Sequence, residues 1–366
     1  MAYSIVFKPI DSVVTLLHPT LRAYLEMDFE VSAEMVKNTP SGDADKQESY
    51  LYLEGDADGC ILRFSKLETL TPYAERVIKD NKVNLATLLP DTKYYAQVFS
   101  TNGEACSERI SFVTENCIVR PLRCIDDEGF GPRNVRDAGG YSTPCGKVKY
   151  GMFYRGTHLN NRLNNTYRMT DGVRKIMVKE LGIRSEIDLR VTGDDDCYYT
   201  ESGEKPVQTA NELDASLPYY KLPLPTYDNI FSNDERNKNI PDIFRVLGKA
   251  ENYPVYLHCN AGADRTGTIV FLLHCLLGVG FADAMHCYEM TTFSPQGKRS
   301  RAYVQQNDNM NYIAMGKFCE RLLTYGDSYQ TATENFLRSL GLADSEINAV
   351  RELLIEKNII NKVTVG

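Results

Sequence analysis

The sequence has few histidines and lacks the motifs of several common hydrolases. Its 366 residues contain five histidines, which are scattered along the chain at His18, His158, His258, His274 and His286. No His-Glu-x-x-His pair, no Gly-x4-Gly-Lys-[Ser/Thr] loop and no Gly-x-Ser-x-Gly turn occurs. These absences disfavour zinc peptidase, P-loop nucleotide hydrolase and α/β-hydrolase chemistry. The sequence therefore predicts neither a metal site nor a cofactor.

Long apolar runs and an excess of basic residues are also missing. The apolar stretch 269–282 is interrupted by His274 and Gly278 and is shorter than the about 20 residues of a membrane-spanning helix. Residues 1–10 lack the apolar core of a signal peptide. The net charge of −8 disfavours a nucleic-acid partner, which requires a basic face. We therefore expect a cytoplasmic protein without integral membrane contact, or an exported one if a leader was removed.

The sequence contains one dense motif, His-Cys-Asn-Ala-Gly-Ala-Asp-Arg-Thr-Gly, at residues 258–267. The preceding run 255–257 predicts a buried strand, and the apolar segment 268–277 predicts a helix. Where a strand turns into a helix, backbone N–H groups converge and the helix dipole adds positive charge. A phosphate-binding loop is therefore predicted, made of Cys259, Asn260, Ala261, Gly262, Ala263, Asp264 and Arg265.

The chemistry of this loop centres on Cys259 as a nucleophile. Converging N–H donors and Arg265 favour its thiolate over its thiol, and the planar guanidinium can bind phosphoryl oxygens bidentately. The Thr266 hydroxyl is predicted to donate to the sulfur when it leaves phosphorus, and His258 is predicted to orient the loop. The alternative is that Cys259 is a buried structural cysteine and that Arg265 forms an ion pair at the start of the helix. This alternative does not explain the whole motif 258–267.

The motif 258–267 resembles the signature of the cysteine-dependent protein tyrosine phosphatase superfamily, and its Asp-Arg-Thr-Gly ending resembles the bacterial tyrosine/lipid phosphatase branch. Further segments resemble motifs of that branch in the same order: residues 134–141 (Asn-Val-Arg-Asp-Ala-Gly-Gly-Tyr), 153–157 (Phe-Tyr-Arg-Gly-Thr), 182–190 (Gly-Ile-Arg-Ser-Glu-Ile-Asp-Leu-Arg), 288–294 and 335–354. The resemblance covers residues 117–366. It implies an α/β catalytic domain that dephosphorylates its substrate without a cofactor.

Two positions depart from the pattern of that branch. Many relatives carry a lysine where this chain has Ala263, and that lysine would add a positive charge for phosphate groups. The resemblance therefore supports a highly phosphorylated lipid substrate less strongly. An aromatic residue is replaced by Val135, which is a conservative change at a buried position. We therefore expect a protein phosphotyrosine phosphatase, with phosphoinositide or inositol phosphate hydrolysis as the alternative.

A phosphatase of this kind needs a general acid to protonate the leaving oxygen, and two aspartates compete for this role. Asp264 lies inside the loop beside Arg265, as in branches whose signature contains the acid. Asp228 lies in a proline-punctuated segment before Cys259, at a spacing that resembles the mobile acid loop of dual-specificity phosphatases. The sequence does not decide between them.

Other charged residues near these motifs are predicted to be structural. Asp137 and Asp188 each stand beside an arginine and are expected to form ion pairs or loop anchors. Arg136 and Arg155 are weaker candidates for substrate contact. The basic segment 298–301 is expected to be a solvated surface turn, with contact to an acidic flank of the substrate as the alternative.

The first part of the chain, residues 1–116, predicts a small all-β sandwich. Residues 20–31 alternate partially with period two, and 92–100 and 107–114 are typical of strands. The segment Leu-Pro-Asp-Thr-x-Tyr-Tyr at 89–95 resembles the tyrosine corner of fibronectin type III domains. This domain is expected either to dock a partner or, as the simpler alternative, to serve only as a rigid body that packs against the rest of the chain.

The second part, residues 117–366, predicts a mostly parallel central sheet flanked by helices. Helices are expected at 172–181 and 240–250, and a strand at 183–189. Two amphipathic helices are expected at 331–340 and 345–356, the second capped by Asp344 or Ser345.

Two other function classes remain possible on this sequence. A pseudophosphatase would use the phosphate-binding loop only to bind phosphate, without turnover. The presence of Cys259, Arg265 and Thr266 argues against this class. A cysteine-based sulfur-transfer enzyme would have a similar loop, but the flanking motifs disfavour it. Expected partners are phosphorylated proteins, lipids or inositols.

Overall fold

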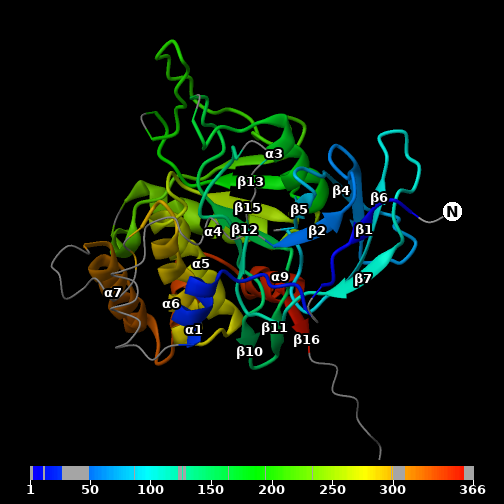
Figure 1. The fold of residues 1–366 in the computed structure, drawn as a ribbon. Helices are drawn as coiled ribbons and strands as arrows, with labels where there is room; N and C mark the ends of the chain where they lie inside the picture. Colours follow the sequence, from blue (N-terminus) through cyan, green and yellow to red (C-terminus); the bar gives the residue numbers. More distant parts are fainter. Residues whose placement is uncertain are drawn as a thin grey trace, which may run out of the picture.

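The computed structural model describes residues 3–10, 13–26, 49–85, 87–122, 126, 129–163, 165–193, 195–232, 234–297, 299 and 310–357. Strands come first along the chain and mixed helices and strands follow, as Figure 1 shows. The protein has a mixed α/β fold with several sheets. No helix within the described ranges is long and apolar enough to cross a membrane.

Two antiparallel sheets make up most of the amino-terminal part. The first has the strand order β1-β2-β5, and the second has the order β4-β3-β6-β7. Their bounds are β1 Val6–Phe7, β2 Tyr50–Glu54, β3 Ile61–Ser65, β4 Ala74–Val77, β5 Lys82–Asn84, β6 Lys93–Phe99 and β7 Ile110–Val113. Alternate residues such as Leu51, Leu53, Leu62 and Phe64 are buried, because successive side chains of a strand point to opposite faces.

The period-two interpretation of residues 20–31 was wrong for the part that the structure describes. Residues Pro19–Glu26 form the helix α1, and residues 27–31 lie outside the described ranges. Leu21 and Tyr24 are buried, and a spacing of three residues places both on one face of a helix. In Figure 1, α1 lies beside α6 and away from the amino-terminal sheets. Tertiary burial of that face therefore decided the local structure.

A six-stranded sheet with the order β14-β13-β15-β12-β9-β8 forms the centre of the second part. Its strands are β8 Arg120–Pro121, β9 Arg136–Asp137, β12 Phe153–Gly156, β13 Ser185–Asp188, β14 Tyr219–Lys221 and β15 Val255–His258. The pairings among β12, β13, β14 and β15 are parallel, and those of β9 with β12 and β8 are antiparallel. The sheet is therefore mostly parallel, and β15 lies inside it.

Helical segments cover both faces of this sheet. Tyr154 and Tyr256 pack with Val173 and Met177 of the segment α3–η2, whereas Phe153, Val255 and Leu257 belong to the cluster that contains α5. The helical elements around the sheet are α3 Asp171–Lys175, η2 Ile176–Glu180, η3 Tyr227–Phe231, η4 Glu235–Lys238, α4 Asn239–Leu247, η5 Ala250–Asn252, α5 Asp264–Leu277, α6 Phe281–Glu289 and η6 Met290–Phe293. Strands buried on both faces explain the continuous apolar run before Cys259.

The carboxyl-terminal elements pack against α4 and α5. They are α7 Met310–Leu322, η8 Leu323–Tyr325, α8 Tyr329–Ser339, α9 Asp344–Leu354 and β16 Ile355–Lys357, which joins β10 Ser142–Thr143 and β11 Gly146–Val148 in a small sheet. The predicted cap of α9 was wrong, because Ala343 is the N-cap residue. Its backbone N–H donates to the carboxylate of Glu346 at 2.7 Å. The side chain that caps the start of α9 therefore comes from within the first turn of the helix.

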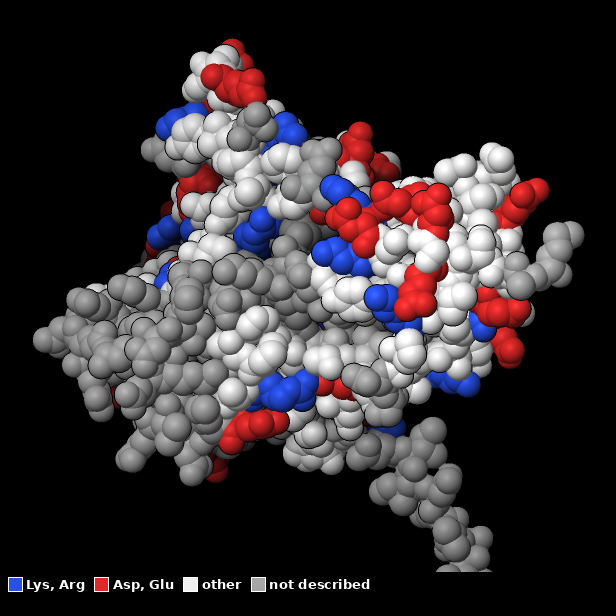
Figure 2. Space-filling view, in the orientation of Figure 1, with Lys and Arg blue, Asp and Glu red and all other residues white. Residues whose placement is uncertain are grey.

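The surface charge is uneven in the view of Figure 2. Acidic side chains are frequent over the amino-terminal sheets on the right, and basic side chains are interspersed among them. This distribution agrees with the net charge of −8. An anionic substrate is therefore not drawn in by the overall charge, and its attraction depends on local groups.

Candidate active site

The segment between β15 and α5 has the geometry of an anion-binding loop. β15 ends at His258, and α5 begins at Asp264. Cys259 is 2% exposed at the entrance of this segment. The backbone N–H groups of residues 260–265 donate to no described residue. Unpaired N–H groups before and within the first turn of a helix are the donors that bind anions in proteins.

Gly262 allows this loop to approach the sheet closely. Its φ is +62°, and a Cβ atom at this position would lie 2.1 Å from the carbonyl oxygen of Gly156 at the end of β12. No side chain fits into that space, so only glycine permits this path of the loop.

Buried side chains from β12 and from the residue Asn134, which precedes β9, hold the carbonyl groups of the loop. The Arg155 guanidinium is fully buried and donates from Nη2 to the Gly262 oxygen at 2.8 Å. Asn134 Nδ2 donates to the oxygens of Ala261 and Gly262 at 3.1 and 3.2 Å, and Arg136 donates in turn to the Asn134 side chain. Arg136 and Arg155 thus support the loop backbone, which explains their occurrence in the motifs.

His258 connects the loop to the neighbouring strand. Its Nε2 lies 2.9 Å from Glu186 Oε1, and its Nδ1 lies 3.0 Å from the Cys259 carbonyl oxygen. Glu186 also accepts from Gln208 Nε2 at 2.7 Å. These residues are buried, so the ring has a fixed orientation behind the nucleophile.

Two further aspartates of the motifs form buried ion pairs, and one of them, Asp188, also lies 3.8 Å from His258 Nδ1. Asp188 accepts from Arg190 through both oxygens, at 2.9 and 2.7 Å. Asp137 pairs with Arg120 at 2.7 Å and not with its sequence neighbour Arg136. Burial opposes the charge of Asp188, but the charges of His258, Arg190 and Lys221 hold its pKa well below the usual range. Both carboxylates therefore stabilise the surrounding structure.

Arg265 lies beside the loop at the start of α5. Its Nη1 donates to the Asp195 carboxylate and to the Leu189 oxygen, the latter at 3.4 Å. Burial opposes its charge, yet the hydrogen bond to Asp195 and the charges of Cys259 and Asp195 raise its pKa. Thr266 is fully buried, and its hydroxyl has no hydrogen-bond partner among the described residues.

Asp264 is held by two residues that are distant in sequence. Arg299 Nε donates to its Oδ1 at 2.8 Å, and Arg299 Nη2 donates to its Oδ2 at 3.1 Å. The Tyr227 hydroxyl also donates to Oδ1, and it lies 2.8 Å from the Tyr288 hydroxyl. Arg299 is 9% exposed, so the prediction of a solvated turn was wrong for this residue. The other residues of 298–301 lie outside the described ranges.

The segment of the second candidate acid forms one wall of a pocket. The pocket has a volume of about 440 Å³ and is lined by Val191, Leu224, Pro225, Thr226, Asn229, Ser232, Asp234, Arg236 and Arg265. Asp228 lies in this segment, in η3, and is half-buried, but it is not one of the lining residues. Its neighbour Tyr227 is buried with a φ of +51°, a conformation that non-glycine residues adopt only where the surroundings enforce it.

Three residues of the site escaped the sequence analysis. Asp195, Tyr227 and Arg299 contact Arg265 or Asp264 across 70, 37 and 35 positions of the chain. Asp195 belongs to an acidic run that resembles a solvated loop, and Arg299 belongs to a basic run. Among these three residues, only Tyr227 could have been found from the sequence, because it lies next to the candidate acid Asp228.

Comparisons with known proteins agree with this geometry. A family model described as the tyrosine phosphatase family matches residues 130–356, which is more than half of the chain. No curated protein matches the chain. No group of three or more His, Cys, Asp or Glu side chains that could hold a metal ion occurs within the described ranges.

Solved structures of inositol pyrophosphate phosphatase cores are among the structural matches. The core catalytic domain of the PP-IP phosphatase SIW14 from S. cerevisiae, in complex with citrate, is 15% identical, and the match covers 48% of this chain and 92% of that chain with a TM-score of 0.28. A second structure of the Siw14 catalytic core is 13% identical and covers 46% and 91%, with a TM-score of 0.26. Similarities at this level do not bear on the substrate of this chain.

Proposed function

The chain belongs to the tyrosine phosphatase family, and from this premise we propose that it hydrolyses phosphomonoesters through a phosphocysteine intermediate. The observation that carries the proposal is the loop 259–265. A buried cysteine, unpaired backbone N–H groups and an arginine with a buried, unpartnered Nε converge there. This arrangement suits a phosphoryl dianion and a thiolate that attacks it.

The proposed reaction has two steps. The Cys259 thiolate attacks phosphorus, the bond to the ester oxygen breaks, and a general acid protonates that oxygen as the alcohol leaves. Water then attacks the phosphocysteine and gives up a proton to the same carboxylate, which releases inorganic phosphate and the thiolate. The Thr266 hydroxyl is proposed to donate to the departing sulfur, because it is buried beside the loop without another partner.

We propose Asp264 as the general acid, with Asp228 as the alternative. Asp264 is the first residue of α5 and precedes Arg265 directly. Arg299 would stabilise the carboxylate that remains after proton transfer, because it donates to both oxygens. Neither Asp264 nor Asp228 lines the pocket that Arg265 lines, so the choice of Asp264 rests on its position beside Arg265 at the start of α5.

A phosphotyrosyl side chain is the proposed substrate group. The pocket beside Arg265 has an apolar wall formed by Val191, Leu224 and Pro225, which suits an aromatic ring. Its second cation, Arg236, is already paired with both oxygens of Asp234. A ring with several phosphates would require more unpaired cations than the described lining provides, so inositol phosphates and phosphoinositides rank second.

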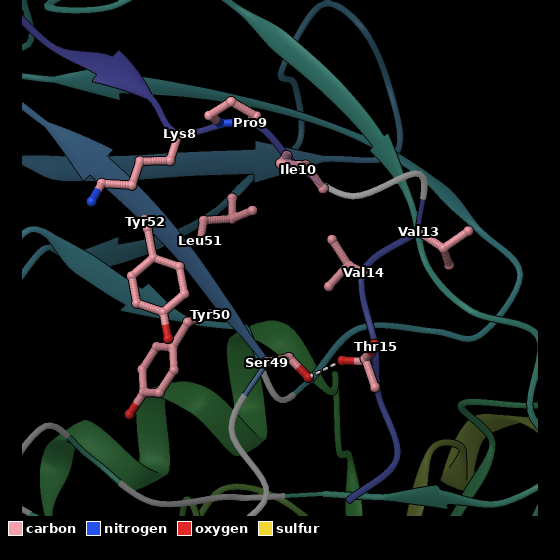
Figure 3. Close-up of a pocket in the computed structure, with 10 residues that line it drawn as sticks. All are labelled: Lys8, Pro9, Ile10, Val13, Val14, Thr15, Ser49, Tyr50, Leu51 and Tyr52. Atoms are coloured by element: carbon pink, nitrogen blue, oxygen red, sulfur yellow. Dashed lines mark hydrogen bonds between the residues drawn. The ribbon is translucent and has the colours of Figure 1, made fainter. Parts of the chain in front are cut away.

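The amino-terminal part is proposed to be a fibronectin type III-like sandwich, 1–116, ahead of a catalytic domain, 117–366, of the bacterial branch. Its two antiparallel sheets support this proposal, as does Tyr94, whose hydroxyl accepts from the Leu89 N–H at 3.0 Å, the contact of a tyrosine corner. A pocket with a volume of about 260 Å³ is lined by residues 8–10, 13–15 and 49–52, which Figure 3 shows. This pocket supports partner docking through the module.

A reducing compartment such as the cytoplasm is the proposed location. The nine described cysteines are all free, and the thiol of Cys259 must remain reduced to react.

Phosphate release from a substrate panel tests the proposal. The panel contains phosphotyrosyl and phosphothreonyl peptides, phosphoinositides and inositol phosphates, and sulfur transfer from thiosulfate is assayed separately. We expect release from phosphotyrosyl peptide that falls roughly a thousandfold or more in Cys259→Ser and is unchanged in Cys145→Ser, the control at an exposed cysteine.

The general acid is identified by comparing Asp264→Asn with Asp228→Asn. Loss of the acid lowers kcat about a hundredfold or more and removes the corresponding limb of the pH profile. We expect this result for Asp264→Asn. Release of no phosphate from any substrate by the reduced wild type would favour a phosphate-binding module without turnover.

A further inference from the structure

The guanidinium of Arg265 is anchored at only one of its nitrogens. Nη1 donates to the carboxylate of Asp195 and to the Leu189 oxygen. Nε is buried and has no partner among the described residues. Nε and Nη2 form the edge of a guanidinium that binds two oxygens of a phosphoryl group side by side. The contact with Asp195 therefore leaves this edge available.

Asp195 lies in a turn that is fixed on both sides. Its Oδ2 also accepts from the Val191 N–H at 3.4 Å. The next residue, Asp196, is 1% exposed, pairs with Lys221 at 2.9 Å and accepts from the Gly193 N–H at 2.5 Å. A carboxylate on such a turn has a defined position, so it can transmit that position to the residue that it contacts.

The Asp195 carboxylate is suited to hold a cation. Its side chain is 26% exposed, and that of Arg265 is 13% exposed, so water screens the pair only in part. Burial alone would raise the pKa of Asp195, but the hydrogen bond and charge of Arg265 outweigh it and hold that pKa below its usual value. The carboxylate is therefore ionised at neutral pH.

We propose that Asp195 is a positioning residue for Arg265, which it holds so that the Nε and Nη2 edge faces the phosphoryl group bound by the loop 259–264. This inference rests on the proposed phosphatase function and adds a residue to it. Asp195 does not touch the substrate. It acts through Arg265, whose side chain would otherwise sample several rotamers at the mouth of the site.

The opposite role for Asp195 is competition with the substrate. A carboxylate that occupied the Nε and Nη2 edge would have to leave before a phosphate binds, and its removal would then increase affinity. Asp195 contacts Nη1 instead. The two roles predict changes of opposite sign, so one set of variants distinguishes them.

The experiment compares the full chain with Asp195→Ala, Asp195→Asn and Asp195→Glu. Asp242→Asn on α4 is the matched control, because it also removes one negative charge and one arginine contact, here with Arg245 at 2.8 Å, and α4 contributes nothing to the pocket lining. The measurements are kcat and KM for a phosphotyrosyl peptide, and the Kd of inorganic phosphate by calorimetry. A thermal melt of each variant identifies any that fail to fold.

Positioning predicts a defined pattern in these measurements. We expect kcat to fall about tenfold to a hundredfold in Asp195→Ala, with a KM change several times smaller. Phosphate should bind at least several times more weakly, and Asp195→Glu should recover part of the lost kcat. The Asp242→Asn control should match the wild type. Unchanged kcat in Asp195→Ala, or phosphate binding tighter than in the wild type, would overturn the proposal.

Failure of the proposed function is distinguishable from failure of this inference. The wild type and Cys259→Ser are assayed in parallel, and an inactive wild type refutes the phosphatase activity. Phosphate binding then still tests Asp195, because anion binding by Arg265 requires no turnover. Weaker binding in Asp195→Ala but not in Asp242→Asn supports positioning, and equal binding or absence of binding by the wild type refutes it.

Discussion

At the scale of single residues, some positions of the site can be occupied by only one type of residue. Gly262 is the clearest case, because both its backbone conformation and the space beside it require glycine. Arg155 is comparable, since it donates to loop carbonyls from a fully buried position. The loop 259–265 is thus shaped from behind by buried groups of the neighbouring strand β12.

Substitution of Gly262 should reduce activity much more than stability. In Gly262→Ala, the new methyl group would collide with the Gly156 carbonyl, so the loop must shift, and displacement of about 1 Å in an active site can cost about a hundredfold in rate. The control is Gly203→Ala, which shares a positive φ of +81° but has open space. There we expect a loss of about 1 kcal/mol in unfolding free energy and normal phosphate release. Equal activity losses in both variants would contradict the collision.

The candidate site residues that the sequence alone could bring together are those that are local in the chain. Cys259, Gly262 and Arg265 lie within one loop between a strand and a helix, so their proximity follows from chain connectivity alone. Asp195 and Arg299 reach the same site through tertiary contacts over 70 and 35 positions. No pattern along the chain encodes such contacts, which is why both residues were assigned to solvated charge runs or passed over.

At the scale of elements, η3 is tied to the start of α5. The Tyr227 hydroxyl bridges Asp264 of α5 and Tyr288 of α6, and burial together with these neighbours raises the Tyr227 pKa. The segment that resembles a mobile acid loop is therefore locked to the phosphate loop in this structure. One hydroxyl group therefore links η3, which flanks the pocket, to Asp264.

Removal of that hydroxyl should loosen the pocket wall. In Tyr227→Phe, we expect backbone amides of 224–231 to exchange with deuterium about tenfold faster, because a hydrogen bond to a carboxylate contributes about 1.5 kcal/mol or more. The control is Tyr220→Phe on β14, which removes a hydroxyl bond to Asn252 Oδ1 at 2.8 Å. Mass spectrometry after exchange measures the effect, and unchanged exchange in Tyr227→Phe would show that packing alone holds η3.

The elements also show where periodicity misleads. The helix expected at 172–181 is present but widens from the α-helix α3 into the π-helical segment η2. Residues 19–26 alternate in part like a strand, yet they form α1 because Leu21 and Tyr24 are buried by packing outside the amino-terminal sheets. A short segment has too little intrinsic preference to resist such tertiary burial.

At the scale of the whole molecule, the two parts of the chain are joined by buried polar contacts. Glu180 of η2 accepts from Arg76 at 2.9 Å and from the Thr87 hydroxyl at 2.7 Å. Arg120 of the central sheet donates to the Leu88 carbonyl at 2.8 Å. These contacts form a joint between the amino-terminal sheets and the part of the chain that contains the central sheet.

Loss of charge at this joint should destabilise the protein. Glu180→Gln leaves Arg76, whose side chain is 14% exposed, without its anion, and breaking such a pair costs about 3 kcal/mol when it is buried. Glu75→Gln at the same joint breaks a pair with Lys175 whose side chains are 32% and 60% exposed, and should cost less than about 1 kcal/mol. Calorimetric unfolding compares them, and a similar Tm for both variants would show that the joint relies on apolar packing.

The amino-terminal helix α1 reaches the catalytic machinery indirectly. Tyr24 donates to Glu289 and packs edge to face on Phe293, with ring centroids 4.8 Å apart. Arg299, six residues after Phe293, donates to the carboxylate of Asp264. Kinetic constants measured on residues 117–366 alone should consequently differ from those of the full chain, because the removed residues 1–116 include α1, which packs against the segment just before Arg299.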